Sequence, residues 1–455
     1  MKKKSASYCR ATDSETLLQL SDELLTAFPF AAPSFTAFDV NAIWHKHLSK
    51  KRTLSQLSWD FRDKKVFAYL LDAHKQQISA VCLTTLVMPN NIDLKFANAY
   101  VRVFNQDVNN CADFNKDEEL WETLRQTRMV RAIARMTGIS TVPFLKTLAT
   151  IQDASHLQYE GIDFLSTILI SNSEATAIKA AGKNLLNFDR RLFLSSALPK
   201  EKWIRAVAGH ADMVLSCFGK AGTIIGVTSL ENNNAKVESS LILPGELQPI
   251  ASFISEGTVA LARAKNGDLY LIVSSGASFV KSHGKWYYLN YESLKSTIRK
   301  FMADIESTQA LVELVLDASH TRKGALYCIP EAEADVSVMV ADYKIKNGPN
   351  YVLRQTSRGL SIKNTMYRKF VSAGASVDGA TILSKTGEIY DVACMIAKPD
   401  KERISAVSSS ELPGYPGARS TAASNASIFG TSIKISSDGP ITVFHKGKIL
   451  GQIGA

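Results

Sequence analysis

The chain has 455 residues, a net charge of +10 and six cysteines, and 45% of its residues are hydrophobic against 21% that are charged. Such a composition excludes a disordered or fibrous chain, and the absence of any apolar run of 18 residues predicts a protein without a membrane span, which we expect in the cytoplasm. The cysteines are far apart and form no CxxC pair, which argues against a zinc finger or a disulfide framework. The positive charge fits an anionic partner such as a nucleotide, a nucleic acid or an acidic lipid.

Residues 1–195 are predicted to form a mixed α/β, sensor-like region. A stripe of leucines from Leu17 to Leu25 predicts a helix that Pro29 ends, and a second helix is predicted from Glu118 to Met136. Four arginines spaced three or four residues apart share one face of that second helix: Arg125, Arg128, Arg131 and Arg135. This stripe is a candidate surface for nucleic acid or anionic lipid, and the alternative is a solvated helix face.

Residues 196–300 are predicted to form a β-rich module. Its clearest signal is a hairpin whose strands flank Asn266-Gly267, because Asn-Gly favours the tight turns that join antiparallel strands. The predicted strands are 223–227, 239–243, 258–262, 269–273 and 285–289.

Residues 301–455 are predicted to form an α/β or α+β domain with a mixed sheet and flanking helices. Ile298, Phe301, Met302 and Ile305 have the spacing of one buried helix face, and a second such pattern runs from Ile362 to Phe370. Further segments complete the domain, with helices at 311–318 and 422–428 and strands at 323–330, 381–383, 389–396, 432–435 and 441–445. The whole chain is thus expected to be of the mixed α/β class.

Two short motifs in this last domain point to a metal-bound nucleotide. Asp378-Gly379-Ala380 supplies a carboxylate for a hard cation, followed by a glycine that lets backbone approach a ligand closely. The second motif begins at Gly417 and opens the predicted helix with Ala418, Arg419, Ser420 and Thr421. A helix start offers unpaired N–H groups to phosphate, so the two motifs together predict a phosphate site.

On these residues, the segment from about 305 to 455 resembles the diadenylate cyclase domain, which is the catalytic part of the DNA-integrity scanning protein and of membrane-bound bacterial cyclases. The matching pieces occur in the family's order: the strand 323–326, the Asp378-Gly379-Ala380 motif, the Gly417 segment and the closing hairpin with Gly447-Lys448. The resemblance implies that two domains face each other, each holding one ATP, and condense the two ATP molecules to cyclic di-AMP with release of pyrophosphate. It also implies that Asp378 holds Mg²⁺ or Mn²⁺ and activates the 3′-hydroxyl, that Gly379 and Ala380 line the nucleotide, and that Arg419 and the helix start bind the phosphates.

The second motif departs from the family. Where the family has Thr-Arg-His-Arg, this chain has Ala418, Arg419, Ser420 and Thr421, so only one of the three charged or ionisable side chains is kept. A hydrogen bond to a charged group contributes about 1.5–3 kcal/mol, so the two losses cost about 3–6 kcal/mol, or 10²- to 10⁴-fold, if nothing compensates. Candidates for compensation are Lys385, Lys446 and Lys448 for the charge, and His320 or His445 for the missing histidine.

Three functions follow as hypotheses. The first is a divergent diadenylate cyclase that is regulated by the N-terminal region. The second is a catalytically degraded nucleotide sensor with the same fold. The third is a nucleic-acid-binding protein that uses the arginine stripe of residues 125–135.

Overall fold

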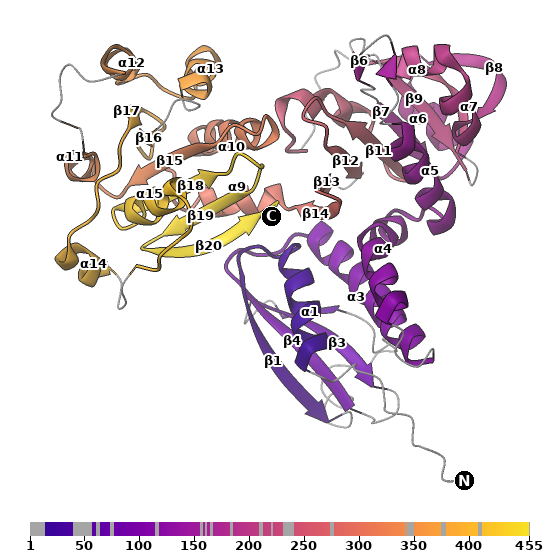
Figure 1. Ribbon diagram of the computed structural model, residues 1–455, viewed down its shortest axis with the longest axis horizontal. Helices are drawn as coiled ribbons and strands as arrows, with labels where there is room; N and C mark the ends of the chain where they lie inside the picture. The colour runs from indigo at the N-terminus through magenta and orange to yellow at the C-terminus, as the bar shows by residue number, and fades with distance from the viewer. Residues whose placement is uncertain are drawn as a thin grey trace. The chain divides into compact units, whose positions relative to one another are not determined.

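The structure is a computed structural model, and the chain divides into two compact units, Met1–Asn290 and Tyr291–Ala455. It describes residues 14–39, 57–60, 64–72, 77–113, 118–154, 158–159, 162–163, 167–182, 185–208, 213–219, 222–230, 241–273, 277–341, 343, 350–374, 379–407 and 412–454. The described elements form mixed sheets with many helices, which confirms the predicted mixed α/β class (Figure 1).

The first unit begins with a small antiparallel sheet and a group of helices. The sheet has the strand order β1 (Ala31–Asp39), β4 (Gln77–Thr85), β3 (Lys65–Asp72), β2 (Leu57–Asp60). The helices are α1 (Ser14–Leu25), α3 (Asn91–Asp113), α4 (Glu118–Thr137) and α5 (Thr141–Ala154). The two helices predicted in this region correspond to α1 and α4, so both predictions are confirmed.

The second sheet of this unit has eight strands. Their order is β14 (Lys285–Leu289), β13 (Ser278–Ser282), β12 (Leu269–Val273), β11 (Thr258–Arg263), β7 (Thr167–Ser171), β9 (Met213–Phe218), β10 (Thr223–Ser229) and β8 (Leu186–Phe193). All neighbours pair antiparallel except β7 and β9. Shorter elements accompany this sheet: the hairpin β5 (Gln158–Tyr159) and β6 (Ile162–Asp163), the helices α6 (Glu174–Ala181), α7 (Leu194–Lys200) and α8 (Lys202–Ala208), and the 3₁₀ helix η2 (Gly245–Phe253). The predicted strands at 223–227, 258–262, 269–273 and 285–289 are confirmed, whereas the described part of 239–243 is not a strand.

The predicted boundary between residues 195 and 196 does not separate two units of the structure. Strands from both sides of that position belong to the eight-stranded sheet. The helices that accompany the small sheet also pack into the core of the eight-stranded sheet. The ring of Phe96 in α3 lies 5.0 Å from that of Phe279 and 4.9 Å from that of Tyr288. The Tyr288 hydroxyl donates a buried hydrogen bond of 2.7 Å to Asp93, the first-turn carboxylate of α3. One continuous apolar core therefore runs from α1 to β14.

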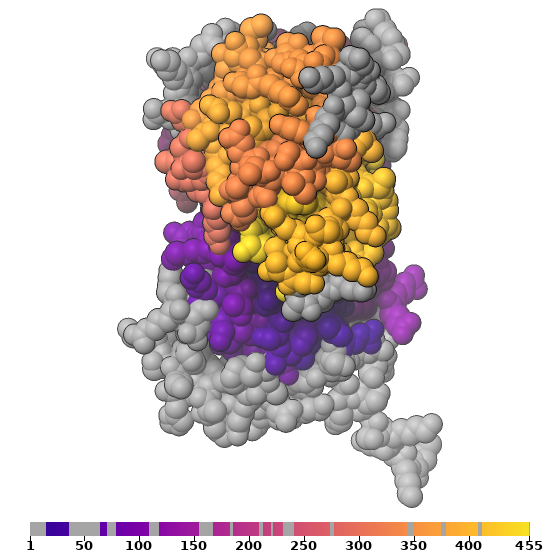
Figure 2. Space-filling view, turned by 90° about the vertical axis from the view of Figure 1, so that its left-hand side faces the viewer, coloured from indigo at the N-terminus to yellow at the C-terminus, as the bar shows by residue number. Residues whose placement is uncertain are grey.

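The second unit contains a six-stranded mixed sheet. Its strand order is β17 (Ile389–Cys394), β16 (Ala380–Leu383), β15 (Ala325–Pro330), β18 (Gly430–Ile435), β19 (Ile441–His445), β20 (Lys448–Ile453). Only β15 and β16 are parallel. The helical elements are α9 (Tyr291–Ile298), α10 (Ile305–His320), η3 (Glu333–Asp335), α11 (Val336–Met339), α12 (Tyr351–Ser357), α13 (Thr365–Gly374), α14 (Lys401–Val407) and α15 (Ala418–Ala426). A space-filling view shows the middle of this unit in orange and its C-terminal part in yellow side by side on one face (Figure 2).

Helices cover both faces of this sheet. Leu326 and Cys328 of β15 share an apolar cluster with Ala423 of α15. The intervening Tyr327 points the other way, because strand side chains alternate between faces, and burial together with the nearby Asp317 of α10 raises its pKa. The sheet thus lies between α10 on one face and α15 on the other. The first turn of α15 lies at one end of the strands.

One predicted helix of this unit is wrong. The apolar spacing from Ile298 to Ile305 predicted a continuous helix, but α9 ends at Ile298 and α10 begins at Ile305. The reason is Asp304, whose carboxylate accepts the backbone N–H of Ser307 at 2.7 Å and so caps a new helix. The remaining predicted helices and strands of the unit are present, with ends shifted by a few residues.

Candidate functional site

The two motifs come together at one end of the second unit's sheet. Parallel pairing sets Tyr327 opposite Thr381, so β15 and β16 begin at the same edge. The antiparallel partner β18 ends at that edge, since its last residue Ile435 pairs with Ala325, the first residue of β15. Helix α15 runs toward Gly430, the start of β18, and its own first turn therefore lies at the edge where β15 and β16 begin.

The first motif enters β16 through a glycine whose conformation and surroundings exclude a side chain. Gly379 has φ +128°, and a Cβ added there would lie 2.5 Å from the backbone carbonyl carbon of Ala393 in β17. Ala393 itself has φ +48°, which is rare for a residue other than glycine. Ala380 is buried, and its carbonyl accepts a hydrogen bond from the Cys394 thiol at 3.2 Å. Asp378, the predicted metal ligand and catalytic residue, lies outside the described residues, directly before Gly379.

The second motif forms the start of α15. Gly417 is the N-cap residue with φ +88°, and no side chain caps the helix. Ala418 is exposed, and within the described chain the N–H groups of Ala418 and Arg419 have no hydrogen-bond acceptor. These are the unpaired donors that the sequence predicted for phosphate.

Arg419 extends from α15 to the beginning of β15. Its guanidinium lies against Gly324, where an added Cβ would be only 2.2 Å from Nη1. The guanidinium is therefore at the same sheet edge as Gly379. No described residue forms an ion pair or hydrogen bond with the Arg419 side chain. The structure thus brings the described parts of both predicted motifs to one edge of the sheet.

The two hydroxyl residues of the motif already have partners. Ser420 is buried and accepts a hydrogen bond from the ammonium of Lys434 in β18, with Nζ 3.0 Å from Oγ. The hydroxyl of Thr421 lies 3.3 Å from the carbonyl oxygens of both Tyr415 and Gly417, which hold it on the loop before the helix. Ser420 therefore holds the Lys434 ammonium at this edge, whereas the Thr421 hydroxyl stabilises the start of the helix.

Lys434 was not among the residues predicted from sequence. The sequence nevertheless contains a sign of its importance: Lys434 is the only charged residue of its strand and lies two residues after Ser432. Alternation along β18 sets both side chains on the face toward α15, and Ser432 donates to the carbonyl oxygen of Ala423 in that helix at 2.6 Å. Sequence alone did not reveal which helix would cover that face.

The three lysines predicted as substitutes lie at the opposite end of the sheet. Lys385 follows β16 and pairs with Glu331 at 3.3 Å, just beyond the C-terminal end of β15. Lys446 lies in the turn between β19 and β20, and Lys448 is the first residue of β20, so both are at the same end of the sheet. A surface pocket of about 390 Å³ is also found there, lined by Glu331, Arg403, Ala406, Val407, Ile428, Phe429, Gly430 and Lys446. Apart from the candidate substitute Lys446, none of the predicted site residues lines that pocket.

Neither candidate histidine reaches the second motif: His445 lies at the other end of the sheet, and His320 lies at the motif end but on the opposite face from α15. His445 ends β19, its Nδ1 lies 3.0 Å from both the Thr431 hydroxyl and the Gly430 carbonyl oxygen, and its ring packs 4.8 Å from that of Phe301. Burial lowers the pKa of His445 below its ordinary value. His320 is buried in the last turn of α10, on the face of the sheet away from α15.

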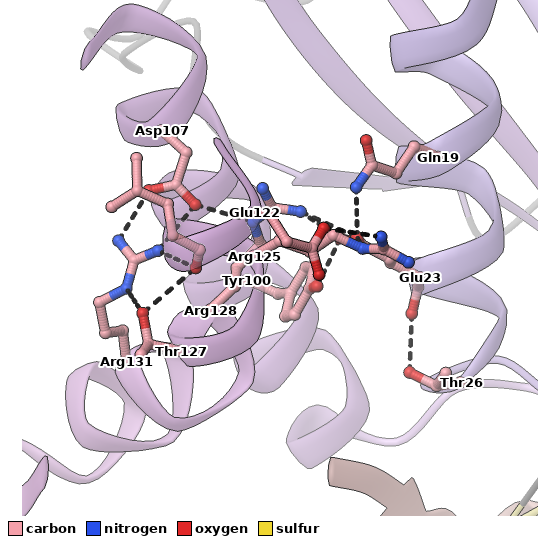
Figure 3. A network of polar contacts seen from close by, with 11 residues as sticks. Gln19, Glu23, Thr26, Tyr100, Asp107, Glu122, Arg125, Thr127, Arg128 and Arg131 are labelled. Atoms are coloured by element: carbon pink, nitrogen blue, oxygen red, sulfur yellow. Dashed lines mark hydrogen bonds and ion pairs between the residues drawn. The ribbon is translucent and has the colours of Figure 1, made fainter. Parts of the chain in front are cut away.

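The arginine stripe of α4 is divided: Arg125 and Arg135 are exposed, whereas Arg128 and Arg131 are turned inward. Arg128 is fully buried, with ion pairs of 2.7 Å to Glu23 in α1 and 2.8 Å to Asp107 in α3, and Arg131 pairs with the same Asp107 at 2.7 Å (Figure 3). Burial opposes the charge of Arg128, but Glu23, Tyr100 and Asp107 outweigh it, so the net effect is a raised pKa. The alternative of a solvated face therefore describes Arg125 and Arg135, whereas acidic partners neutralise Arg128 and Arg131 inside the unit.

In the described part of the chain, no group of three or more histidine, cysteine or acidic side chains is arranged to hold a metal ion. No helix there is both long enough and apolar enough to cross a membrane. Comparisons with family models, curated proteins and solved structures returned no match for this chain. The resemblance to the diadenylate cyclase domain therefore stays a prediction that is based on the motifs.

Proposed function

We propose that the second unit binds ATP and that two such units, face to face, condense two ATP molecules to cyclic di-AMP. The observation that carries the proposal is the position of Arg419, whose guanidinium lies against Gly324 at the edge where Gly379 leads into β16. The described part of the carboxylate motif, which begins at Gly379, and the phosphate motif about 40 residues later thus lie at one sheet edge, and a nucleotide bridging the two motifs requires this arrangement.

In this proposal the chain positions the reactants and neutralises their charge. Each 3′-hydroxyl attacks the α-phosphate of the other ATP, a new P–O bond forms, the bond to the β-phosphate breaks, and pyrophosphate leaves. Arg419 and the first N–H groups of α15 bind phosphate oxygens, and Gly379 and Gly417 leave room for the nucleotide. The described residues alone do not make a metal site, so Mg²⁺ or Mn²⁺ would depend on Asp378 and on the phosphates themselves.

The proposal assigns the first unit a regulatory role and places the protein in the cytoplasm, where ATP is available. A second candidate is a nucleotide sensor that does not turn over its ligand. It is favoured by the positions of the residues proposed to replace the missing charges of the second motif. Lys385, Lys446 and His445 all lie at the end of the sheet away from the two motifs. The Thr421 hydroxyl is likewise held by backbone carbonyls. Binding survives the loss of such groups more readily than a reaction rate does, because catalysis requires closer positioning.

An ATP turnover assay distinguishes the two. Purified protein with ATP and Mn²⁺ is expected to yield cyclic di-AMP, Asp378→Ala to abolish the product, and Arg419→Ala to lower kcat/KM by about 10- to 150-fold, the value of one charged hydrogen bond. Lys401→Ala is the matched control, because this exposed lysine begins α14 and lies outside both motifs. Stabilisation by ATP without product would support the sensor, and the absence of both product and binding would reject both functions.

A further inference from the structure

Lys434 is the one cation of β18, and the fold holds it beside the second motif. Its neighbours across the sheet, Leu326 in β15 and Thr442 in β19, are both buried. The side chain therefore leaves the strand toward α15, where its ammonium donates to Ser420 in the first turn at 3.0 Å. A lysine stem that crosses an apolar layer to reach this point is held more firmly than one on an open surface.

The position is electrostatically unfavourable without a ligand. The N-terminal end of a helix carries a partial positive charge, so a cation there is repelled. Arg419 adds a second positive charge from the same turn. Among the described residues, neither Lys434 nor Arg419 forms an ion pair. Two cations and the positive end of α15 thus share one sheet edge, and an anion with several charges relieves this repulsion.

We propose that Lys434 is a phosphate-binding residue that replaces the positive charge missing from the second motif. This inference rests on the proposed function, since it names a further contact to the ATP triphosphate. The ammonium has three donors, of which Ser420 takes one, so two remain for phosphate oxygens. Ser420 is then a positioning residue, which explains why a hydroxyl at this position of the motif is useful although it carries no charge.

The experiment measures the binding of ATP and of inorganic tripolyphosphate to the full-length protein by calorimetry. Lys434→Met keeps the apolar stem and removes the charge, and we expect it to weaken both ligands by about 10- to 150-fold. Lys434→Arg should restore most of the affinity, and Ser420→Ala should weaken binding by a few-fold through loss of positioning. Lys448→Met is the control, because this exposed lysine lies at the other end of the same sheet.

A second readout separates binding from a structural role. Because the ligand-free protein holds repelled cations together, Lys434→Met is expected to keep or raise the thermal midpoint without ligand. A lowered midpoint together with lost binding would show that Lys434 is structural and would overturn the inference.

The outcomes also separate this inference from the proposed function. If Lys434→Met binds ATP as the wild type does, the inference is wrong and the nucleotide site stands. If tripolyphosphate binds with dependence on Lys434 but ATP does not bind, the anion site stands and the proposed function falls. If the wild type binds neither ligand, both are rejected.

Discussion

Gly324 is the residue on which the position of Arg419 depends. A Cβ at residue 324 would meet the end of a flexible side chain, the guanidinium at 2.2 Å, and not backbone. We therefore expect Gly324→Ala to fold with little loss of stability but to displace Arg419, and to weaken ATP binding by about 10-fold or more. Isothermal titration measures the binding, and thermal unfolding without ligand measures the stability.

Two further glycines serve as comparisons for this prediction. Gly414 has open space around its Cα, so Gly414→Ala should change neither quantity. Gly379→Ala should lower stability, because its φ of +128° and the backbone of Ala393 both oppose a side chain. Equal ATP affinity for wild type and Gly324→Ala would contradict the placement of Arg419 in the phosphate site.

At the scale of single residues, sequence predicted the glycines of the site better than its charges. Gly379 and Gly417 were identified because both motifs require close backbone approach, and both have positive φ. Which charged side chains lie at the site depends on which end of a strand and which face of a helix are near it, and this is determined by the tertiary structure. Lys434 was missed for that reason, and the candidate Lys385 could not be placed: the two lysines lie at opposite ends of the two strands that flank β15.

At the scale of elements, the joint between α9 and α10 shows where apolar spacing misleads. The pattern from Ile298 to Ile305 has helical periodicity, yet Asp304 interrupts it as an N-cap. Its carboxylate accepts from both the N–H and the hydroxyl of Ser307 and pairs with Lys363 at 2.9 Å. The capping signal Asp-x-x-Ser was present in the sequence, but a strong apolar pattern can span a cap without any change in spacing.

This cap makes part of the stability of the second unit depend on pH. The backbone N–H of Ser307 and the Lys363 ammonium lower the pKa of Asp304 from 3.8 to about 2. A carboxyl with a lowered pKa in the folded state stabilises the fold above its unfolded pKa, and this contribution is lost as the pH falls toward 2. Asp304→Asn keeps an acceptor oxygen without the charge, so wild type should be the more stable protein at pH 6, and the difference should shrink between about pH 4 and pH 2.

The measurement for Asp304 is unfolding followed by circular dichroism at several pH values. All five tryptophans precede residue 291, so tryptophan fluorescence reports on the first unit alone and provides the internal control. A difference between wild type and Asp304→Asn that is independent of pH would contradict the role of the charge.

At the scale of the whole molecule, sequence predicted the mixed sheets and a boundary after residue 300, whereas the structure divides the chain after Asn290 and unites the first two predicted regions. That union depends on contacts such as Phe96 with Phe279 and Asp93 with Tyr288, which join positions almost 200 residues apart. No local pattern contains such pairings. The inward turn of Arg128 and Arg131 was missed for the same reason, since their partners Glu23 and Asp107 are on other helices.

Each unit has its own buried ion pair, so the stability of each unit can be tested with a separate substitution. Arg128 is fully buried against Asp107 in the first unit, and Arg354 of α12 holds the buried Asp391 of β17 through two hydrogen bonds of 2.9 and 2.7 Å in the second. Removing one partner of a buried pair costs about 3–5 kcal/mol, and the cost here is smaller because Asp107 keeps Arg131 and Asp391 keeps Arg358. Arg128→Met and Arg354→Met are matched variants, since both remove the charge and keep an unbranched apolar side chain.

We expect each substitution to act on its own unit. Peptide-resolved hydrogen exchange should show faster exchange within residues 14–290 for Arg128→Met and within residues 291–454 for Arg354→Met. Only Arg128→Met should lower the midpoint reported by tryptophan fluorescence, because no tryptophan lies in the second unit. Equal acceleration of exchange in both units by either variant would mean that the two cores unfold as one, and a division at residue 290 would then not describe how the protein unfolds.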